Sequence, residues 1–486
     1  MSAPAMEAVI GLEVHAELLT RSKIFCGCSA TFGAPPNTNV CPVCLGMPGV
    51  LPVLNRRVVE FAIRAGLATH CTVAPASVFA RKNYFYPDIP KGYQISQYEL
   101  PICTGGHIDI LVDGTPKRVG LTRIHMEEDT GKNVHDAHVA DSLVDFNRSG
   151  VPLLEIVSEP DLRTPAEAGA YLRTLRSILQ YLEICDGNME EGSFRCDANV
   201  SVRPAGRPTF GTKVEIKNMN SFRAVEKAIT YEIARQEQAV ADREPIVQET
   251  RHWDADREET RSMRSKESAH DYRYFPDPDL LTLALDPAWI ADIRGTMTEL
   301  PAERRQRLER DLGLSAYDAD VLTQRKDVAD YFEAGIAAGA PAKDMANWTQ
   351  TEILRIVRDE KLDEALVIRD WPIAAAQLAK LIRLVADGVV NRNTAKGLLP
   401  KLRGTDTDPE ALVQAEGLAQ VSDRGALEAA VRDVVAKNPD QVAQFRAGKD
   451  KVLGFFVGQI MKATGGKANA QLVQELLRAA LAEDNR

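Results

Sequence analysis

The chain has 486 residues, 44% of them hydrophobic, which is enough for two to four domains with sizeable apolar cores. Its formal net charge of −10 argues against a protein that binds nucleic acid with its whole surface, although one basic patch is compatible with it. Because Glu7 comes early and no uninterrupted apolar run of about 18 residues occurs, we expect neither a signal peptide nor a membrane span, and we predict a cytoplasmic protein.

The first predicted strand, residues 9–18, has one apolar and one polar face. Glu13, His15 and Glu17 alternate with apolar residues, so their side chains share a face. A Glu-x-His pair on such a face can present both groups to one cation or one substrate. An ordinary solvated face is the alternative.

Four cysteines follow this strand at close spacing, as a CxC and a CxxC element. In a chain without an export signal, such elements favour a structural zinc site over disulfides. Four thiolates suit a closed tetrahedral Zn²⁺ without an open position for chemistry, whereas reduced thiols are the alternative. The predicted ligands are Cys26, Cys28, Cys41 and Cys44.

Residues 56–68 have the spacing of a helix, and residues 81–97 follow as an aromatic stretch with prolines and little sign of regular structure. Such a stretch more often packs over a cavity than extends into solvent. A hairpin is predicted over 107–122, because Asp113-Gly114 is a strong turn pair.

Acidic residues then lie among apolar ones in two places. Glu155 interrupts a buried-strand pattern, and Glu127, Glu128 and Asp129 are consecutive. An ionised carboxylate is costly to bury unless a basic side chain, hydrogen-bond donors or a metal ion compensates it. A salt-bridged acid and a solvated acidic turn are the alternative interpretation.

Two further strands, 194–203 and 213–217, repeat the alternation of the first strand, and a helix over 165–184 is signalled by Thr164 as its N-cap. Three strands with mixed acid, base and amide faces predict one antiparallel sheet with a polar working surface. A long helix over 221–241 and an Arg/Glu-rich stretch then form the edge of this domain.

We therefore predict an α+β fold in three parts. Residues 1–295 form a domain built on an antiparallel sheet with flanking helices, residues 296–408 an all-α linker domain, and residues 409–486 a small α-helical tail domain after a linker-like segment at 404–409. Residues 442–468 contain five Lys or Arg and one acid. Such a unit can bind a phosphate backbone, and a solvated helix surface is the alternative.

Six segments are highly specific: GLEVHAEL, KNYFYPDIPKGYQISQ, HMEEDTGK, LVDFNRSGVPLLEIVSEPD, MEEGSFRCDANVSVRP and EIKNMNSF. In this order they closely resemble the B subunits of bacterial tRNA-dependent amidotransferases, and the similarity extends over nearly the whole chain. The segment GKDKVLGFFVGQIMKATGGKAN is similar to the YqeY-like tail module of that family.

The resemblance implies a reaction on Glu-tRNA(Gln) or Asp-tRNA(Asn). The side-chain carboxylate is activated by ATP to an acyl phosphate, and ammonia from a partner amidase subunit displaces the phosphate. A small third subunit links the other two in a heterotrimer. The first domain would be the catalytic cradle, and no Walker A motif is present, so a sheet face and Mg²⁺ would hold ATP.

The resemblance also implies site residues. The Mg²⁺ site falls on His15, Glu128 and Glu155, with Glu13 close by as a fourth catalytic residue, although strand phase alone does not choose between Glu127 and Glu128. Because imidazole is not a preferred Mg²⁺ ligand, binding of His15 through water or binding of Mn²⁺ stays open. Candidates for the nucleotide and a second cation are Arg195, Asp197, Asn199, Glu215 and Lys217.

The aromatic stretch would line the ammonia entry through Lys82, Tyr84, Tyr93 and Gln97, and the tail would bind tRNA through Lys449, Lys451, Lys462 and Lys467. Zinc is inferred from this sequence alone. The rival hypothesis from another class is a non-catalytic tRNA-binding scaffold subunit, and without the resemblance the polar sheet would also suit a metal-dependent hydrolase.

Overall fold

The computed structural model describes residues 5–135, 142–265, 272–362, 368, 370–419, 424–464, 468 and 470–482. The chain divides into two compact units, Met1–Glu303 and Arg304–Arg486. Every strand of the described residues lies in the first unit, and the second is helical. The predicted α+β class is confirmed.

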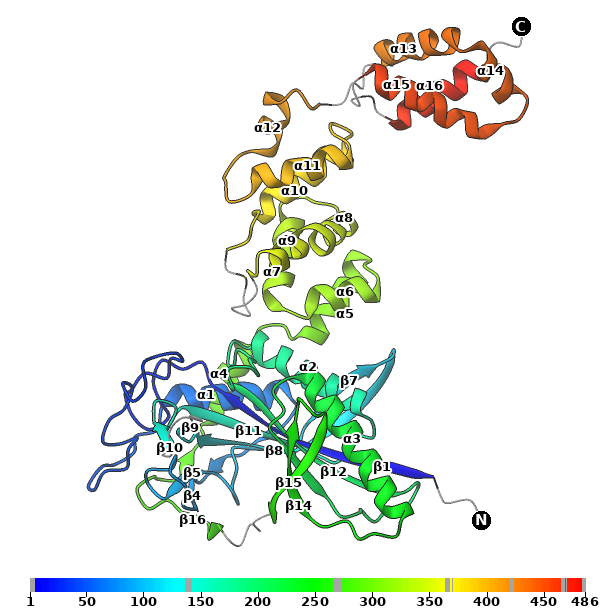
Figure 1. Ribbon diagram of the computed structural model, residues 1–486. Coiled ribbons are helices and arrows are strands. Elements are labelled where there is room, and N and C mark those ends of the chain that lie inside the picture. Colours follow the sequence, from blue (N-terminus) through cyan, green and yellow to red (C-terminus); the bar gives the residue numbers. More distant parts are fainter. Residues whose placement is uncertain are drawn as a thin grey trace. The chain divides into compact units, whose positions relative to one another are not determined.

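A ten-stranded sheet organises the first unit (Figure 1). Its central strands follow the order β13-β12-β1-β11-β8, and β8 also pairs with β7 in the predicted hairpin around Asp113-Gly114. The strands are β1 (Met6–Glu17), β2 (Thr72–Val73), β6 (Cys103–Thr104), β7 (His107–Val112), β8 (Thr115–Glu128), β11 (Pro152–Ser158), β12 (Phe194–Pro204), β13 (Val214–Lys217), β14 (Glu249–Asp254) and β15 (Glu259–Ser265).

The sheet is mainly antiparallel, as expected, and contains one parallel pair in the described residues. Strands β13 and β14 run parallel, whereas the other pairs of the described sheet are antiparallel. A parallel pair needs a long crossover connection, and α3 (Phe222–Ala241) lies between these two strands in the chain. The Arg/Glu-rich stretch therefore extends the sheet as its edge strands β14 and β15.

Helices cover the apolar face of this sheet. Residues of α1 (Arg56–Ala68), α2 (Pro165–Tyr181) and α3 share one buried cluster with Leu12, Val14 and the other inward residues of β1. Thr164 caps α2, as predicted, although the helix ends at Tyr181. A fourth helix, α4 (Pro287–Gly295), packs near α1. The opposite, polar face of the sheet stays available for a site.

Three small sheets complete the first unit. Strand β4 (Ala80–Asn83) pairs with β5 (Tyr93–Ser96) and with β16 (Phe275–Pro276); β9 (Lys132–His135) pairs with β10 (Ser142–Asp145), and β3 (Ala76–Ser77) with β17 (Leu283–Ala284). The prediction of an irregular stretch at 81–97 is thus wrong at its two ends. Strand β16 lies almost 200 residues away in the chain, so local composition does not indicate this pairing.

The second unit contains two separate apolar clusters. The first is built by α5 (Pro301–Leu312), α6 (Ala316–Thr323), α7 (Lys326–Ala337), α8 (Ala342–Trp348), the π-helical turn η2 (Thr349–Ile353), α9 (Leu354–Asp359), α10 (Ala375–Ala386), α11 (Arg392–Leu402) and α12 (Pro409–Ala415). The side chains of Ser315 and Asn391 cap α6 and α11.

The other cluster holds the tail together. It is formed by α13 (Arg424–Lys437), α14 (Pro439–Arg446), the short turn η3 (Asp450–Val452), α15 (Leu453–Ala463) and α16 (Ala470–Ala482). Val413 of α12 belongs to the preceding cluster, beyond the predicted boundary at 408/409. In the described residues, no helix is long and apolar enough to cross a membrane.

Candidate active site

The register of the sheet gathers acids and imidazoles on its polar face. His15 of β1 lies opposite Glu155 of β11, and Glu155 lies opposite His125 of β8. Side chains of directly paired residues share a face, and Glu127, two positions after His125, shares it too. Four groups from three neighbouring strands therefore converge.

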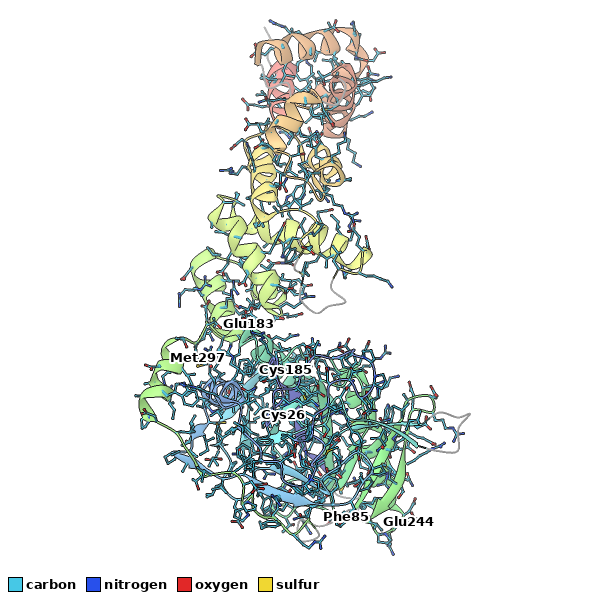
Figure 2. All side chains as sticks on the ribbon, turned by 90° about the vertical axis from the view of Figure 1, so that its left-hand side faces the viewer. Cys26, Phe85, Glu183, Cys185, Glu244 and Met297 are labelled. Carbon is cyan, nitrogen blue, oxygen red and sulfur yellow. The ribbon has the colours of Figure 1, made fainter. Side chains whose placement is uncertain are left out.

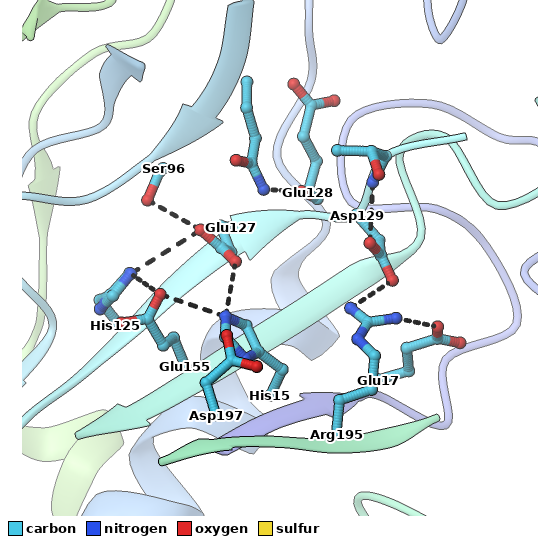
Figure 3. A network of polar contacts seen from close by, with 12 residues as sticks. His15, Glu17, Ser96, His125, Glu127, Glu128, Asp129, Glu155, Arg195 and Asp197 are labelled. Atoms are coloured by element: carbon cyan, nitrogen blue, oxygen red, sulfur yellow. Dashed lines mark hydrogen bonds and ion pairs between the residues drawn. The ribbon is translucent and has the colours of Figure 1, made fainter. Parts of the chain in front are cut away.

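The distances within this cluster are those of a candidate metal centre (Figure 3). His15 Nε2 lies 3.4 Å from Glu155 Oε2 and 3.9 Å from Glu127 Oε1. Nε2 of His125 lies 3.5 Å from Glu155 Oε2 and 3.8 Å from Glu127 Oε2. One ligand atom from each of His15, Glu127 and Glu155 fits within 4.8 Å of the others, so this donor set could hold one cation.

Both carboxylates of the cluster are charged. Burial raises the pKa of Glu155, but His125 and His15 more than offset this, so its pKa lies well below the usual value. The pKa of Glu127 is also lowered, because the hydrogen bond and charge of His125 outweigh its burial. Ser96 Oγ donates to Glu127 Oε2 at 3.1 Å. The two buried carboxylates are compensated here by the two imidazoles, and a bound cation could take the place of the imidazole protons.

A cavity of about 510 Å³ lies over this face. The Lys82 ammonium lies 4.9 Å from the ring centroid of Tyr272 and 5.6 Å from that of Tyr84. Burial lowers the pKa of Lys82, but Glu127 and the other acids raise it above its usual value, so the group is charged. The cavity is lined by Glu13, His15, Lys82, Tyr86, Ser96, Gln97, Tyr98, Arg123, His125, Glu127, Glu155, Asp197, Glu215, Lys217, Thr250, Met263, Tyr272 and Tyr274.

The end of the cavity over β12 and β13 has a second set of charges. Lys217 Nζ lies 2.5 Å from Asp197 Oδ2 and 3.8 Å from Glu215 Oε1. Asn199 Nδ2 donates to Glu13 Oε1 at 2.8 Å, and its buried Oδ1 accepts no hydrogen bond in the part of the chain that the structure describes. An ammonium and three carboxylates thus line this end of the cavity, whereas Asn199 holds Glu13 and does not line the described cavity.

A second cavity, of about 200 Å³, lies on the other side of β8. Glu128 faces it and forms an ion pair of 2.5 Å with Lys91. Tyr93 lines it as well, together with two cysteines of the predicted zinc quartet. The sulfurs of all four cysteines, Cys26, Cys28, Cys41 and Cys44, lie within 4.8 Å of one another.

The cysteine sulfurs are arranged as one candidate metal site. Cys44 Sγ lies 3.9 Å from Cys41 Sγ and accepts a hydrogen bond from the Cys41 backbone N–H at 3.1 Å. A hydrogen bond from the Cys26 thiol lowers the pKa of Cys44 to about 4, so one thiolate exists at neutral pH. The set has the composition of a structural zinc site.

Comparison with known proteins identifies the family. The model of the GatB/GatE catalytic domain matches residues 8–291, and that of the GatB domain matches residues 330–481. The chain belongs to the GatB family. Similar proteins, named as the B subunits of aspartyl/glutamyl-tRNA(Asn/Gln) amidotransferases, occur in Geobacter sulfurreducens, 59% identical over 97% of this chain and 98% of the relative, and in Solidesulfovibrio magneticus, 58% identical over 98% and 99%.

One predicted ligand of this GatB chain does not lie in the cluster. Glu128 was expected beside His15 and Glu155, but it faces the second cavity, and Glu127 takes the place beside them (Figure 3). The reason is the pairing of β8 with β11, which aligns Glu155 with His125 and so fixes which of the two consecutive acids shares its face. In this register Glu127, and not Glu128, shares a face with Glu155.

Arg195 is also placed differently from the prediction. Its guanidinium is held by Asp129 at 2.8 Å and Glu17 at 3.3 Å, and it does not line the described cavity, whereas Asp197, Glu215 and Lys217 do. Of the predicted ammonia-entry residues, Lys82 and Gln97 line the larger cavity and Tyr93 the smaller, while the Tyr84 hydroxyl donates to Gln94 Oε1 at 3.2 Å.

The predicted tRNA-binding lysines Lys449, Lys451 and Lys462 are exposed on the tail, and Lys467 lies outside the described residues. The sequence prediction missed several residues of the two cavities: His125, Arg123, Lys91, Tyr98, Tyr272 and Tyr274. His125 could have been found from its spacing of two residues to Glu127, which places both on one face of a strand. The remaining missed residues could not have been found from the sequence, because their positions at the cavities depend on contacts between segments that are distant in the chain.

Proposed function

We propose that this GatB chain activates the side-chain carboxylate of Glu-tRNA(Gln), Asp-tRNA(Asn) or both with ATP, and then amidates it with ammonia. The His15, Glu127 and Glu155 cluster carries this proposal, because a carboxylate is activated by an anionic nucleotide only where positive charge neutralises both. The names of the relatives supply the class of substrate.

The cluster would hold Mg²⁺ through His15, Glu127 and Glu155, with His125 beside it. When bound, Mg²⁺ neutralises phosphate charge and aligns the reacting groups. Arg123, 3.8 Å from Glu155, adds a fixed positive charge at the same edge of the cavity. The Lys82 ammonium would attract the substrate carboxylate toward the cluster.

The nucleotide would lie over β12 and β13. Lys217 would contact phosphate, and Asp197, Glu215 and Glu13 would take a second cation. Asn199 would position Glu13 for this role through its side-chain amide, which donates to Glu13 Oε1.

Ammonia would arrive from the partner amidase through the smaller cavity. The support is that Glu127 and Glu128, consecutive residues, face the two cavities, and that Gln94, which accepts a hydrogen bond from Tyr84, holds the backbone of Glu128 in place. Gln94 Nε2 donates to the Glu128 carbonyl at 2.7 Å. A narrow passage favours ammonia over bulk water, which would hydrolyse the activated carboxylate.

Three further features complete the proposal. The cysteine quartet would bind a structural Zn²⁺ that fixes the loop beside the smaller cavity. Exposed lysines of the tail would contact the phosphate backbone of tRNA. The chain would work in a heterotrimer with an amidase subunit and a small linking subunit.

The test is product formation by the reconstituted complex with Glu-tRNA(Gln), ATP, Mg²⁺ and free ammonium, which bypasses the amidase. Glu155→Gln removes one charge from the cluster and is expected to lower the rate at least about 100-fold. The matched control is Glu159→Gln, an exposed acid just after the same strand, with a rate within twofold of wild type. Unchanged turnover by Glu155→Gln with normal tRNA binding would support the scaffold alternative instead.

A further inference from the structure

The larger cavity has an aromatic wall opposite its charged floor. Tyr98 and Tyr274 are stacked, with ring centroids 4.3 Å apart and an interplanar angle of 7°. Tyr272 meets Tyr274 edge-on at 6.1 Å, and Tyr84 meets Tyr272 edge-on at 5.8 Å. The pairing of β4 with β5 and β16 brings these rings together from two distant segments of the chain.

This aromatic wall leads from solvent to the charged cluster. Tyr98 is 39% exposed although it lines the cavity, so its ring is accessible at the mouth. At the inner end, Lys82 Nζ lies 4.9 Å from the Tyr272 ring, and the charges of Glu127 and Glu155 act on this ammonium. A ligand that extends along the wall would have one end on Tyr98 and the other at the cluster.

We propose that Tyr98, backed by Tyr274, is the stacking platform for the 3′-terminal nucleobase of the tRNA substrate. The inference rests on the proposed function and adds a specificity residue to it. An exposed aromatic ring whose other face is supported by a second ring is suited to an unpaired base, which stacks without a requirement for sequence. The ribose of that nucleotide and the attached aminoacyl group would then lie against Tyr272 and Lys82.

The base of ATP is the other source of a nucleobase. The charges assigned to phosphate and a second cation lie over β12 and β13, around Lys217, Asp197 and Glu215. The aminoacyl group must reach His15, Glu127 and Glu155, and Lys82 connects the aromatic wall to this cluster. The wall therefore fits the acceptor end of tRNA better than the nucleotide.

The test is equilibrium binding of uncharged tRNA(Gln), intact or lacking its 3′-terminal adenosine, to the assembled complex. The wild type is expected to bind intact tRNA about tenfold more tightly than the truncated one. Tyr98→Ala is expected to lose this preference, and Tyr98→Phe to keep it because the ring remains. The control is Phe85→Ala, which removes a ring 78% exposed on the loop between β4 and β5; Phe85, labelled in Figure 2, does not line the described cavity.

Two outcomes would overturn the proposal. The first is a Tyr98→Ala variant that still prefers intact tRNA by the wild-type factor. The second is a rise in the KM for ATP of Tyr98→Ala with unchanged tRNA preference, which would assign the ring to the base of ATP. Binding of uncharged tRNA requires no chemistry, so failure of the activation mechanism leaves this measurement interpretable.

Discussion

The choice between two consecutive acids determines which chemistry each side of β8 can support. Glu127 lies with His15 and Glu155, whereas Glu128 pairs with Lys91 in the smaller cavity and accepts a hydrogen bond from the Ile95 backbone N–H at 2.8 Å. Two consecutive residues of β8 thus face different sites. Glu127 is a candidate metal ligand, and Glu128 lines the candidate passage for ammonia.

Substitutions of Glu127 and Glu128 by Gln are therefore expected to impair different steps of the reaction. Glu127→Gln removes a ligand and should raise the Mg²⁺ concentration for half-maximal activity with free ammonium at least about tenfold. Glu128→Gln should keep the wild-type Mg²⁺ requirement and lose activity mainly with glutamine as nitrogen donor. Titration of Mg²⁺ with each donor, at saturating ATP and tRNA, makes the comparison.

A raised Mg²⁺ requirement in Glu128→Gln together with a normal one in Glu127→Gln would contradict the assignment. Thermal unfolding of both variants is the necessary control, because removal of one partner from the buried pair with Lys91 costs about 3–5 kcal/mol. A loss of activity that follows the loss of folded protein would not count for either residue.

At the scale of elements, alternation along single strands predicted which residues of β1, β12 and β13 share the polar face. The helix N-cap Thr164 was predicted too, because capping depends on local sequence. The phase of Glu127 and Glu128 was not predictable, because it depends on the register between β8 and β11. The strand β5, which begins at Tyr93, was not predictable either, because its small sheet also contains β16 around Phe275, a distant segment of the chain.

The cysteine loop is an element with few regular hydrogen bonds of its own, since residues 18–55 contain no named helix or strand. Lys23, fully buried, donates from Nζ to the Asn39 carbonyl at 2.7 Å and to the Phe146 carbonyl at 3.3 Å. A metal ion on the four sulfurs would fix the remainder of the loop around the smaller cavity.

Cys41→Ser is accordingly expected to reduce bound zinc from one ion per chain to none and to lower the melting temperature. Each kcal/mol lost lowers the Tm of the first unit, Met1–Glu303, by about 1.5–2 °C. Elemental analysis of the purified complex and calorimetry measure the two effects. Cys185→Ala, a buried cysteine outside the quartet, should keep its zinc; wild-type protein without zinc would refute the site.

At the scale of the whole molecule, the charges of the chain are unequally distributed. The net charge is −10, yet the tail exposes Lys449, Lys451 and Lys462 around α14 and α15. The tail has an apolar cluster of its own, formed by residues from Leu427 to Leu481, so substitutions on its surface need not disturb the active site. The proposed contacts of the tail with the phosphate backbone and of Tyr98 with the acceptor end are therefore expected to be separable by mutation.

The triple variant Lys449→Ala, Lys451→Ala and Lys462→Ala should weaken tRNA binding and reduce the slope of log K against log salt by about 3, because each lost phosphate contact removes about one counterion. The rate at saturating tRNA should stay at the wild-type value, as should the preference for an intact 3′ end. Lys437→Ala is the control, since Lys437 is exposed on α13 but pairs with Asp433 at 2.6 Å. An unchanged salt slope in the triple variant would exclude these lysines from the tRNA contact and leave binding to the first unit and the remaining helices.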